Sequence, residues 1–328
     1  MAVLIFSESY DVSTDPVVEY LNQMKVPFVR INTNLNRDNI FSVSIHNDSI
    51  TIEFSLNGKN YSIDDFDLIW ARRGFFYFEK PNLSNKLKYN ELENIFQSHI
   101  DEEINCLTDF LTYYIKNSNI LCIGNPSVKN MNKLIVLQKA IQYGLNVPKT
   151  QIAKETSILA NVFSENEELV SKPISERLSY YIPKNDTKPS LTTAHQNMLT
   201  NMNELQSSEF YYSLFQKAID IKFELRVFFI LDEYFACAIF MKEDVRNMMP
   251  YQLPEEILSK LKLLMKDLDL NTGSIDLLID AELNYHFLEV NPYGQIEWIA
   301  RECFPSLHYN IASIIKSNYE KAKNNRIY

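Results

Sequence analysis

The sequence is short of the residues on which several common kinds of binding site depend. Only six of its 328 residues are glycine, so a phosphate site here cannot depend on a glycine-rich loop. The four cysteines form no CxxC pair, which argues against a zinc site and a disulfide framework and favours a reducing compartment; they are Cys106, Cys122, Cys237 and Cys303. No apolar run approaches the length of a membrane-spanning helix, and the stretch MAVLIFSESYD lacks the basic start and cleavage site of a signal peptide.

Positive charge is also in deficit. The chain carries 32 basic against 42 acidic residues, a formal net charge of −10 and a pI of about 5.1. Proteins that bind duplex nucleic acid usually have a basic excess, so neither nucleic acid nor a membrane is expected as a partner. Apolar residues make up 46% of the chain, enough for a sizeable core in two or three domains. We therefore expect a soluble, cytoplasmic protein.

Hydrophobic patterns in the first part of the chain predict an α/β unit. A strand at 2–7, a helix at 15–25 with Asp15 as its N-cap, and a strand at 27–32 form a βαβ opening. Further elements complete this unit, residues 1–125: an antiparallel meander at 41–63, a strand at 67–74, a helix at about 88–116 and a strand at 120–126.

The rest of the chain is expected to divide into residues 126–213 and 214–328. The middle part has a helix at 127–143, capped by Ser127 and ended by Gly144, then a strand at 169–175, a hairpin within 176–196 and a helix at 196–205. The last part has strands at 211–219, 223–231 and 234–242, an amphipathic helix at 254–270, and a final pair of strands at 274–280 and 285–291.

Two carboxylates interrupt this last pair of apolar strands. Glu289 and Asn291 are two residues apart and share one face of a strand. If Asp280 pairs with Tyr285, Asp276 lies directly opposite Glu289. Opposed carboxylates repel unless a cation lies between them or one is protonated. Two carboxylates and an amide oxygen suit Mg²⁺. The alternative is a solvated polar group on an exposed face of the sheet.

A magnesium ion with so few protein ligands usually acts together with a nucleotide, which directs attention to the cations. Lys172 lies in the apolar strand VSKPI, and Lys133 lies in the first turns of the helix at 127–143. Arg226 alternates with Glu224, so both point to one face, and Arg246 follows in EDVRN. Taken singly, each of these residues is equally typical of a solvated surface charge.

Together, these segments resemble the ATP-grasp ligases over roughly residues 125–300. The resemblance is carried, in order, by NK…LQKA…GLNVPKT, SKPI, FQKAI…ELRVFFI, SIDLLI and FLEVNPYGQIEWI. LIWARRG, FQ…KFELRV and EVNPYGQ are more narrowly similar to the ATP-grasp peptide maturases that make graspetides, including the microviridin ligases and the grasp-with-spasm group. The implied α/β (α+β) fold has a Rossmann-like pre-ATP-grasp domain, a central lid and a C-terminal mixed-sheet domain. The lid segment SERLSYYIPKND departs from many ATP-grasp enzymes because it contains no glycine.

The resemblance implies a role for each candidate residue. Arg226 would neutralise the γ-phosphate and the developing acyl phosphate, and Arg246 would face the acyl phosphate. ATP would be bound by Lys133, Lys172, Gln216, Lys217, Ala218, Ile219 and Glu224. Two Mg²⁺ ions would be ligated by Asp276, Glu289 and Asn291.

The resemblance also implies an activity and a peptide partner. The expected enzyme phosphorylates Asp or Glu side chains of a ribosomal precursor peptide and closes them onto Ser or Thr hydroxyls as ω-esters. Alternatives are ω-amide formation, a free-standing amino-acid ligase that adds glutamate, a nucleotide-binding module without turnover, and an interaction scaffold. Arg72 and Arg73 are candidates for the acidic core peptide, or one of them makes a structural ion pair. The leader would dock on the hairpin within 176–196 and on the helix after it, and a homodimer is expected.

Overall fold

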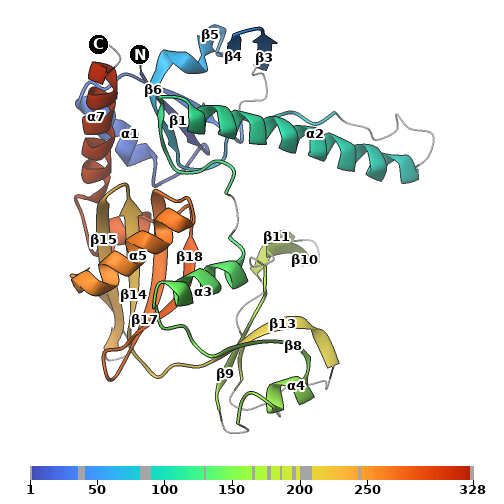
Figure 1. Cartoon of the computed structure of the whole chain (residues 1–328), viewed down its shortest axis with the longest axis vertical. Helices are drawn as coiled ribbons and strands as arrows, with labels where there is room; N and C mark the ends of the chain where they lie inside the picture. The colour runs from blue at the N-terminus through green and yellow to red at the C-terminus, as the bar shows by residue number, and fades with distance from the viewer. Residues whose placement is uncertain are drawn as a thin grey trace.

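The computed structural model describes residues 2–35, 41–81, 90–128, 131–164, 167–175, 179–184, 187–193, 197–199, 209–242 and 245–325. Within these ranges the chain forms parallel and antiparallel sheets flanked by helices, a mixed α/β architecture (Figure 1). The predicted α/β class is therefore confirmed. No helix in these ranges is both long and apolar enough to cross a membrane.

The N-terminal part is built on a parallel sheet with the strand order β2-β1-β6-β7. Its elements are β1 (Ala2–Ser7), α1 (Asp15–Gln23), β2 (Phe28–Asn32), the 3₁₀ helix η1 (Ile63–Asp65), β6 (Phe66–Ala71) and β7 (Leu121–Ile123). The predicted meander is present as a separate antiparallel sheet of β3 (Phe41–His46), β4 (Ser49–Leu56) and β5 (Lys59–Ser62). Thr14, not the predicted Asp15, occupies the N-cap position of α1.

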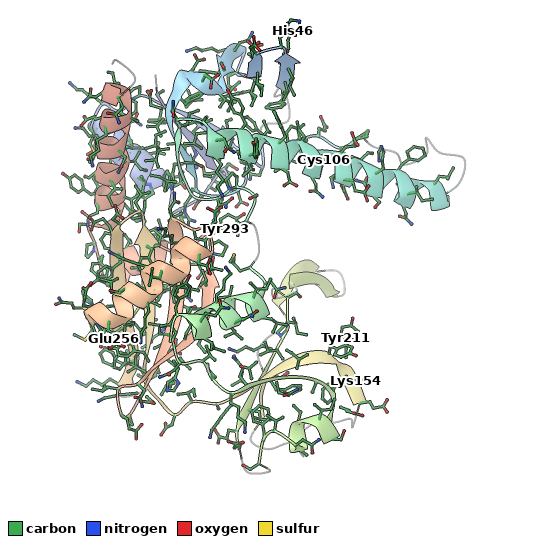
Figure 2. All side chains as sticks on the ribbon, in the orientation of Figure 1. His46, Cys106, Lys154, Tyr211, Glu256 and Tyr293 are labelled. Carbon is green, nitrogen blue, oxygen red and sulfur yellow. A yellow bond between two sulfur atoms is a disulfide. The ribbon has the colours of Figure 1, made fainter. Side chains whose placement is uncertain are left out.

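A long helix, α2 (Asn90–Asn117), projects from this part of the molecule like an arm (Figure 1). Leu111 and Ile115, near its C-terminal end, are buried against the sheet, whereas Ile95 and Phe96 near its start are exposed. Cys106 lies on the projecting part (Figure 2). Only the last turns of α2 therefore contribute to the core.

The middle part contains a small sheet with the strand order β12-β9-β13-β8 and a separate hairpin of two strands. Its elements are α3 (Lys133–Gln142), β8 (Thr150–Glu155), α4 (Thr156–Ala160), β9 (Leu169–Lys172), the hairpin strands β10 (Ser179–Lys184) and β11 (Thr187–Thr193), β12 (Asn197–Leu199) and β13 (Glu209–Lys217). Tyr211 and Lys154 lie together in this lobe (Figure 2). The helix predicted at 196–205 is wrong where it can be compared, because Asn197–Leu199 pairs with β9.

The helix predicted at 127–143 is shorter than expected. It starts at Lys133, where the Asn132 side chain accepts hydrogen bonds from the N–H groups of Leu134 and Ile135. Ser127 is therefore not the cap. The predicted end is right: Gly144 has a φ of +70° and directly follows the last helical turn.

The C-terminal part is a five-stranded antiparallel sheet with the strand order β16-β15-β14-β17-β18. Its elements are β14 (Ile221–Ile230), β15 (Glu233–Lys242), β16 (Val245–Tyr251), α5 (Glu255–Asp267), β17 (Thr272–Asp280), β18 (Tyr285–Asn291), α6 (Glu297–Glu302) and α7 (Leu307–Asn325). Alternate residues of β14 face opposite sides. Leu225 and Val227 pack with α3 and α5, whereas Phe228 and Ile230 pack with α6 and α7.

The C-terminal helix α7 joins the N-terminal and C-terminal parts. Its buried residues lie in one core with Val3 and Trp70 of the N-terminal sheet and Phe228 of β14. This helix was not predicted from the sequence, although Ile311, Ile315 and neighbouring apolar residues recur at helical spacing. One hydrophobic core therefore contains residues from both sides of the domain boundary predicted at residue 125, and this boundary stays a prediction.

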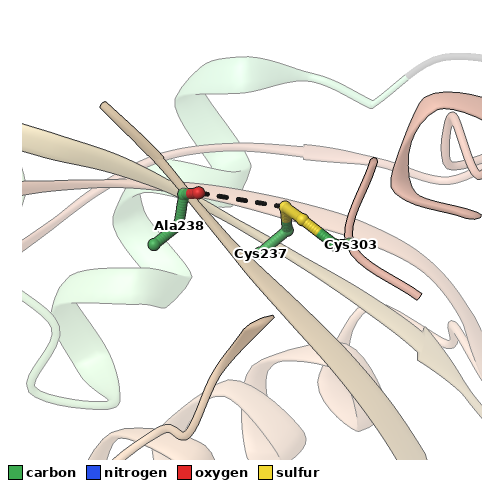
Figure 3. The surroundings of a disulfide bond; sticks show 3 residues. All are labelled: Cys237, Ala238 and Cys303. Carbon is green, nitrogen blue, oxygen red and sulfur yellow. Dashed lines mark hydrogen bonds between the residues drawn. A yellow bond between two sulfur atoms is a disulfide. The ribbon is translucent and has the colours of Figure 1, made fainter. Parts of the chain in front are cut away.

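One cross-link contradicts the expected absence of disulfides. Cys237 on β15 is bonded to Cys303 at the end of α6, and both side chains are buried (Figure 3). The two cysteines are 66 positions apart in the sequence. Spacing alone could not reveal this pair, because it forms only when α6 packs on the sheet.

Candidate functional site

Three charged residues lie in a row across the middle of the five-stranded sheet. Arg226 of β14 is the direct partner of Asp276 on β17, and Asp276 is the direct partner of Glu289 on β18. The opposition of the two carboxylates is thus confirmed. The count that led to it was wrong by one residue, since Ile279 and not Asp280 pairs with Tyr285. A bulge at Leu288 restores the alignment.

Asp276 is the central residue of this row, and its neighbours shift its pKa in opposite directions. Asp276 accepts a hydrogen bond from Arg226 Nε at 2.5 Å and a second from Nη2. Burial raises the pKa of Asp276, the Arg226 guanidinium lowers it, and the charges of Glu289 and Glu224 raise it, with a net upward shift. The row therefore has one cation for two closely spaced acids and favours an additional positive charge.

Asn291 lies at the end of β18 and stabilises the turn that follows. Its Oδ1 accepts hydrogen bonds from the N–H groups of Tyr293 at 3.1 Å and Gly294 at 3.2 Å. It is paired with Ser274, two residues from Asp276, so it lies on the same face as Glu289. Within the described ranges there is no group of three or more His, Cys, Asp or Glu residues that could hold a metal. The predicted metal ligands number two carboxylates and one amide.

The charged row lines a cleft of about 780 Å³ between the C-terminal sheet and the small sheet of the middle part. Most of the predicted nucleotide-binding residues line this same cleft; they are Lys172, Gln216, Lys217, Ala218, Ile219 and Glu224, together with Arg246. Apolar side chains form much of the remaining wall; they are Pro148, Val170, Ile221, Leu225, Ile239, Met248, Leu277, Leu278 and Leu288. The cleft combines an apolar wall with a charged one.

The segment between β13 and β14 forms one end of the cleft. Gln216 is buried and donates through Nε2 to Thr150 Oγ1 at 3.0 Å. Lys217 forms an ion pair with Glu167 at 2.9 Å, and this contact lowers the pKa of Glu167. The backbone N–H groups of Lys217 and Ala218 donate to the carbonyls of Lys149 and Glu168. These contacts fix the path of the chain from one sheet to the other.

Lys133 and Asn291 line an adjoining cavity of about 310 Å³, which shares Arg226, Glu289 and Gln295 with the main cleft. Lys133 Nζ donates to the carbonyls of Pro173 at 3.1 Å and Ser175 at 2.9 Å. It therefore connects the start of α3 with the segment that follows Lys172.

Three residues that line this cleft had no role predicted from the sequence. The Trp298 ring of α6 has the Arg226 guanidinium carbon 5.2 Å from its centroid and that of Arg246 at 5.9 Å. Gln295 Oε1 accepts from Arg226 Nη1 at 3.5 Å, and Arg301 lies one helical turn beyond Trp298. Gln295 and Trp298 stand in the quoted segment EVNPYGQIEW, so their place beside the charged strand was a usable signal.

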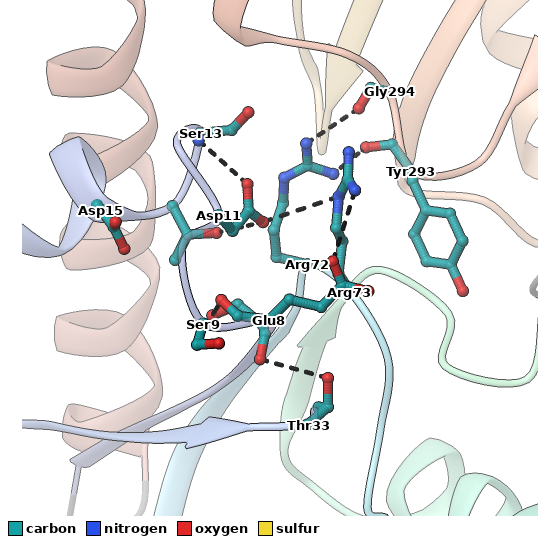
Figure 4. A network of polar contacts seen from close by, with 12 residues as sticks. Glu8, Ser9, Asp11, Ser13, Asp15, Thr33, Arg72, Arg73, Tyr293 and Gly294 are labelled. Carbon is teal, nitrogen blue, oxygen red and sulfur yellow. Dashed lines mark hydrogen bonds and ion pairs between the residues drawn. The ribbon is translucent and has the colours of Figure 1, made fainter. Parts of the chain in front are cut away.

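The two arginines proposed to bind peptide do not line this cleft or the cavity beside it. Their surroundings are shown in Figure 4. Arg72 is 5% exposed, and its guanidinium donates to the backbone carbonyls of Tyr293 and Gly294. This inward position differs from the one expected for a residue that contacts a peptide. Arg73 is more exposed and lies 3.8 Å from carboxylate oxygens of Glu8 and Asp11.

The arrangement fits a magnesium nucleotide. The opposed carboxylates of Asp276 and Glu289 can supply hard oxygen donors, and the Asn291 amide oxygen can join them by giving up one of its two backbone hydrogen bonds. Lys133, Lys172 and Arg226 can supply positive charge for phosphates. The apolar wall offers a surface for a base, and Glu224 offers a carboxylate for hydroxyl groups. Because Asp276 is already shared with Arg226, a cation there would contact the oxygens that this guanidinium leaves accessible.

Comparison with protein-family models and with curated proteins found no match. Solved structures do match. The macrocyclase MdnC from Microcystis aeruginosa MRC, bound with precursor peptide MdnA, is 21% identical with a TM-score of 0.74, covering 97% of this chain and 100% of its own. A RiPP-associated ATP-grasp ligase from Chryseobacterium gregarium, in complex with ADP and a leader and core peptide, is 20% identical with a TM-score of 0.75, covering 98% and 97%. The macrocyclase MdnB from Microcystis aeruginosa MRC is 20% identical with a TM-score of 0.72, covering 96% and 98%. The chain therefore has the fold of ATP-grasp ligases over nearly its whole length.

Proposed function

We propose that this chain is an ADP-forming ATP-grasp ligase that modifies a ribosomally made precursor peptide. In this proposal it phosphorylates Asp or Glu side chains of the peptide and closes them onto Ser or Thr hydroxyls. The products are ω-ester macrocycles of the graspetide type. ATP is the phosphoryl donor, and two Mg²⁺ ions are its cofactors.

The observation that carries this proposal is the row Arg226–Asp276–Glu289 on the wall of the cleft. Two acids opposed on neighbouring strands, with an arginine that is bonded to Asp276 and lies on the far side of it from Glu289, are unfavourable without further positive charge. A divalent ion that arrives with a nucleotide provides this charge. The similarity in fold to ATP-grasp ligases, including one solved with ADP, points to the same ligand.

The nucleotide end of the cleft has residues suited to the base and the ribose. The chain at Gln216–Ile219 connects the two sheets and is fixed by backbone hydrogen bonds, so it forms a rigid edge for adenine. Glu224 is exposed in the cleft two residues from Arg226, and its carboxylate can accept hydrogen bonds from ribose hydroxyls.

The phosphate end has residues suited to phosphoryl transfer. ATP with Mg²⁺ would supply the phosphoryl group and neutralise its charge, which turns a poor acyl donor into a reactive acyl phosphate. Lys133 and Lys172 would orient the phosphates, and Asp276, Glu289 and Asn291 would hold the metal. Arg226 is fixed by Asp276 on one side and by the Trp298 ring on the other, so its guanidinium is preorganised to stabilise the charge that develops on the transferred group.

The peptide end would lie beyond Trp298. Arg246 and Arg301 border the cleft there, where they can bind the carboxylate that is to be activated. Arg73 remains a candidate contact for an acidic core peptide. The hairpin β10–β11 remains the proposed docking site for a leader segment. MdnC was solved with a precursor peptide and the Chryseobacterium gregarium ligase with a leader and core peptide, which supports a peptide as the substrate here.

The proposal is tested by incubating the protein with ATP, Mg²⁺ and an acidic, Thr-rich precursor encoded beside it. Each ring should remove one water from the peptide mass and release one ADP, and mild alkali should open the rings because they are esters. Rings that survive alkali would indicate ω-amides. Transfer of free glutamate to an acceptor, without loss of water from the peptide alone, would indicate an amino-acid ligase.

Two further outcomes would overturn an enzymatic role. Binding of ATP without any ADP release, with every acceptor tried, would indicate a nucleotide-binding module. Failure to bind ATP at all would leave an interaction scaffold.

The proposal also covers the domain boundaries, the oligomeric state and the location of the protein. We assign residues 1–125, 126–213 and 214–328 to the pre-ATP-grasp, lid and C-terminal ATP-grasp domains. A homodimer is proposed and is tested by light scattering at several protein concentrations. The cytoplasm is proposed as the location and is tested by fractionation of the source cells.

A further inference from the structure

The buried Arg72 links the N-terminal sheet to a turn at the other end of the chain. It follows β6 directly, and its Nη1 and Nη2 donate to the carbonyl oxygens of Tyr293 and Gly294, the latter at 3.0 Å. Its side chain reaches across from the N-terminal part to these residues (Figure 4). The two carbonyls are more than 220 positions from Arg72 in the sequence, so this contact exists only in the assembled fold.

The same turn is bound from its other side by a predicted metal ligand. Asn291 Oδ1 accepts hydrogen bonds from the N–H groups of Tyr293 and Gly294, whose carbonyls bind Arg72. Gly294 has a φ of +57°, and a Cβ there would lie 3.1 Å from the Phe228 ring. The turn therefore has little freedom to adopt another shape.

The environment of Arg72 preserves its charge in spite of burial. Burial lowers the pKa of Arg72 to about 10, and the charge of the nearby Asp11 acts in the opposite direction. A planar guanidinium can donate to two adjacent carbonyls at once, which a lysine ammonium does with less directional control. The contact of Arg72 with the two carbonyls therefore depends on both the charge and the forked shape of its guanidinium.

The turn leads directly to the charged row. Gln295 follows Gly294 and accepts a hydrogen bond from Arg226. Asn291 precedes the turn and lies two residues from Glu289 on the same face. A change in the turn would therefore displace residues at both of its ends, and both line the cavities of the site.

We propose that Arg72 is a positioning residue for the magnesium–nucleotide site, which it serves by fixing the turn that orients Asn291 and Gln295. The N-terminal part of the chain then contributes directly to the geometry of the site. This inference rests on the proposed function, because it assigns Arg72 to the metal site of that function. A purely structural tie between the two parts would instead affect stability alone.

The test compares two conservative arginine substitutions, Arg72→Lys at a buried position and Arg30→Lys at a partly buried one. Arg30 is the matched control because it also donates to a backbone carbonyl, that of Glu8, and to Asp15, but makes no contact with the turn. Both variants keep the positive charge and lose the fork. Thermal unfolding first establishes that both are folded and by how much each is destabilised.

The first readout is hydrogen exchange of peptides that cover Asn291–Gln295, measured without ligand. Arg72→Lys should speed exchange in this segment about tenfold, and Arg30→Lys should leave it unchanged. The second readout is the Mg²⁺ concentration at half-maximal binding of a fluorescent ADP. Arg72→Lys should raise it about tenfold, with binding in EDTA unaltered, as for other residues that support metal ligands.

The outcomes separate the inference from the proposed function. Unchanged exchange in Arg72→Lys would overturn the inference, whether or not the protein binds nucleotide. Faster exchange with an unchanged Mg²⁺ midpoint would also overturn it and leave Arg72 as a structural tie. If the wild-type protein binds ADP without any response to Mg²⁺, the proposed function fails, and with it the assignment of Arg72 to a metal site.

Discussion

One face of the five-stranded sheet carries two regions of opposite character. Towards one end of β14 it presents Glu224 and Arg226, with Asp276 and Glu289 on the neighbouring strands. Further along the same face, Phe228 and Ile230 are buried against α6 and α7. In both regions every second residue of the strand faces this side of the sheet, so the two regions differ only in the residue types at these positions.

The boundary between these regions is formed by residues from α6 and β15. Trp298 places its ring beside Arg226 and Arg246, and the buried bond between Cys237 and Cys303 joins α6 to the sheet. Cys237 is itself the direct partner of Arg226 on the sheet. The part of this face that is buried against α6 and α7, the core half, therefore supports the charged part, the site half, and only the site half is built at a cost in stability.

The largest effect is expected from Glu289→Gln in the site half. Turnover should be abolished, because the substitution removes half of the opposed carboxylate pair. Stability in EDTA should be unchanged or raised, because the negative charge of Glu289 contributes to the raised pKa of Asp276. ADP release and thermal unfolding measure the two effects. Full activity in this variant would refute the metal assignment. Gln295→Glu is not a suitable control, because it adds a negative charge beside Arg226.

Arg226→Lys should produce the next largest effect. The lysine keeps one positive charge beside Asp276 but loses the bidentate contact and the planar surface against Trp298. We expect the phosphoryl-transfer rate to fall about 100-fold, as when one preorganised donor is removed. Nucleotide affinity should fall much less. Single-turnover kinetics and equilibrium binding separate the two, and equal losses would reduce Arg226 to a binding residue.

A substitution in the core half should have the opposite effect, with stability reduced and nucleotide binding kept. Ile230→Ala removes a fully buried side chain and should lower the free energy of unfolding by about 2–5 kcal/mol. Denaturant unfolding measures this loss. Nucleotide affinity per folded molecule should be unchanged, since Ile230 does not line the cleft. A large loss of affinity at low temperature, where the variant is folded, would mean that the two halves are not separable.

The smallest expected effect lies at the tip of the β17–β18 hairpin. His286 Nε2 lies 2.8 Å from Asp280 Oδ2 and, as the largest cause, lowers the pKa of Asp280 from 3.8 to about 2. A carboxyl group whose pKa is lowered by folding stabilises the fold above its unfolded pKa and loses this contribution as the pH falls. His286→Gln should therefore reduce stability at neutral pH and flatten the loss between pH 3.8 and about 2. Unfolding midpoints across this pH range provide the measurement, and an unaltered acid limb would contradict it.

Much of the site could be predicted from the sequence because it lies on regular strands. Alternation placed Glu224 with Arg226 and Glu289 with Asn291, and the hairpin brought Asp276 opposite Glu289. That pairing was reached with a register wrong by one residue, which the bulge at Leu288 corrects. A bulge cannot be recognised in an apolar sequence. The pairing of Asp276 with Glu289 was predicted correctly only because the bulge compensates for the error of one residue in the predicted register.

The features that could not be predicted depend on contacts between distant segments. Arg72 follows a strand end, as expected, but only the assembled fold reveals that its partners are the carbonyls of Tyr293 and Gly294. The bond between Cys237 and Cys303 requires α6 to pack on β15. The role of Trp298 requires the same packing. The position of α6 was the missing information in both cases.

A crystal structure with Mg²⁺ and a non-hydrolysable ATP analogue would test the proposed metal site directly. We expect an ion within about 2.1 Å of carboxylate oxygens from both Asp276 and Glu289, with the phosphates against Arg226 and Lys172. A nucleotide bound elsewhere, or no ion between these two carboxylates while Asp276 stays paired only with Arg226, would contradict it.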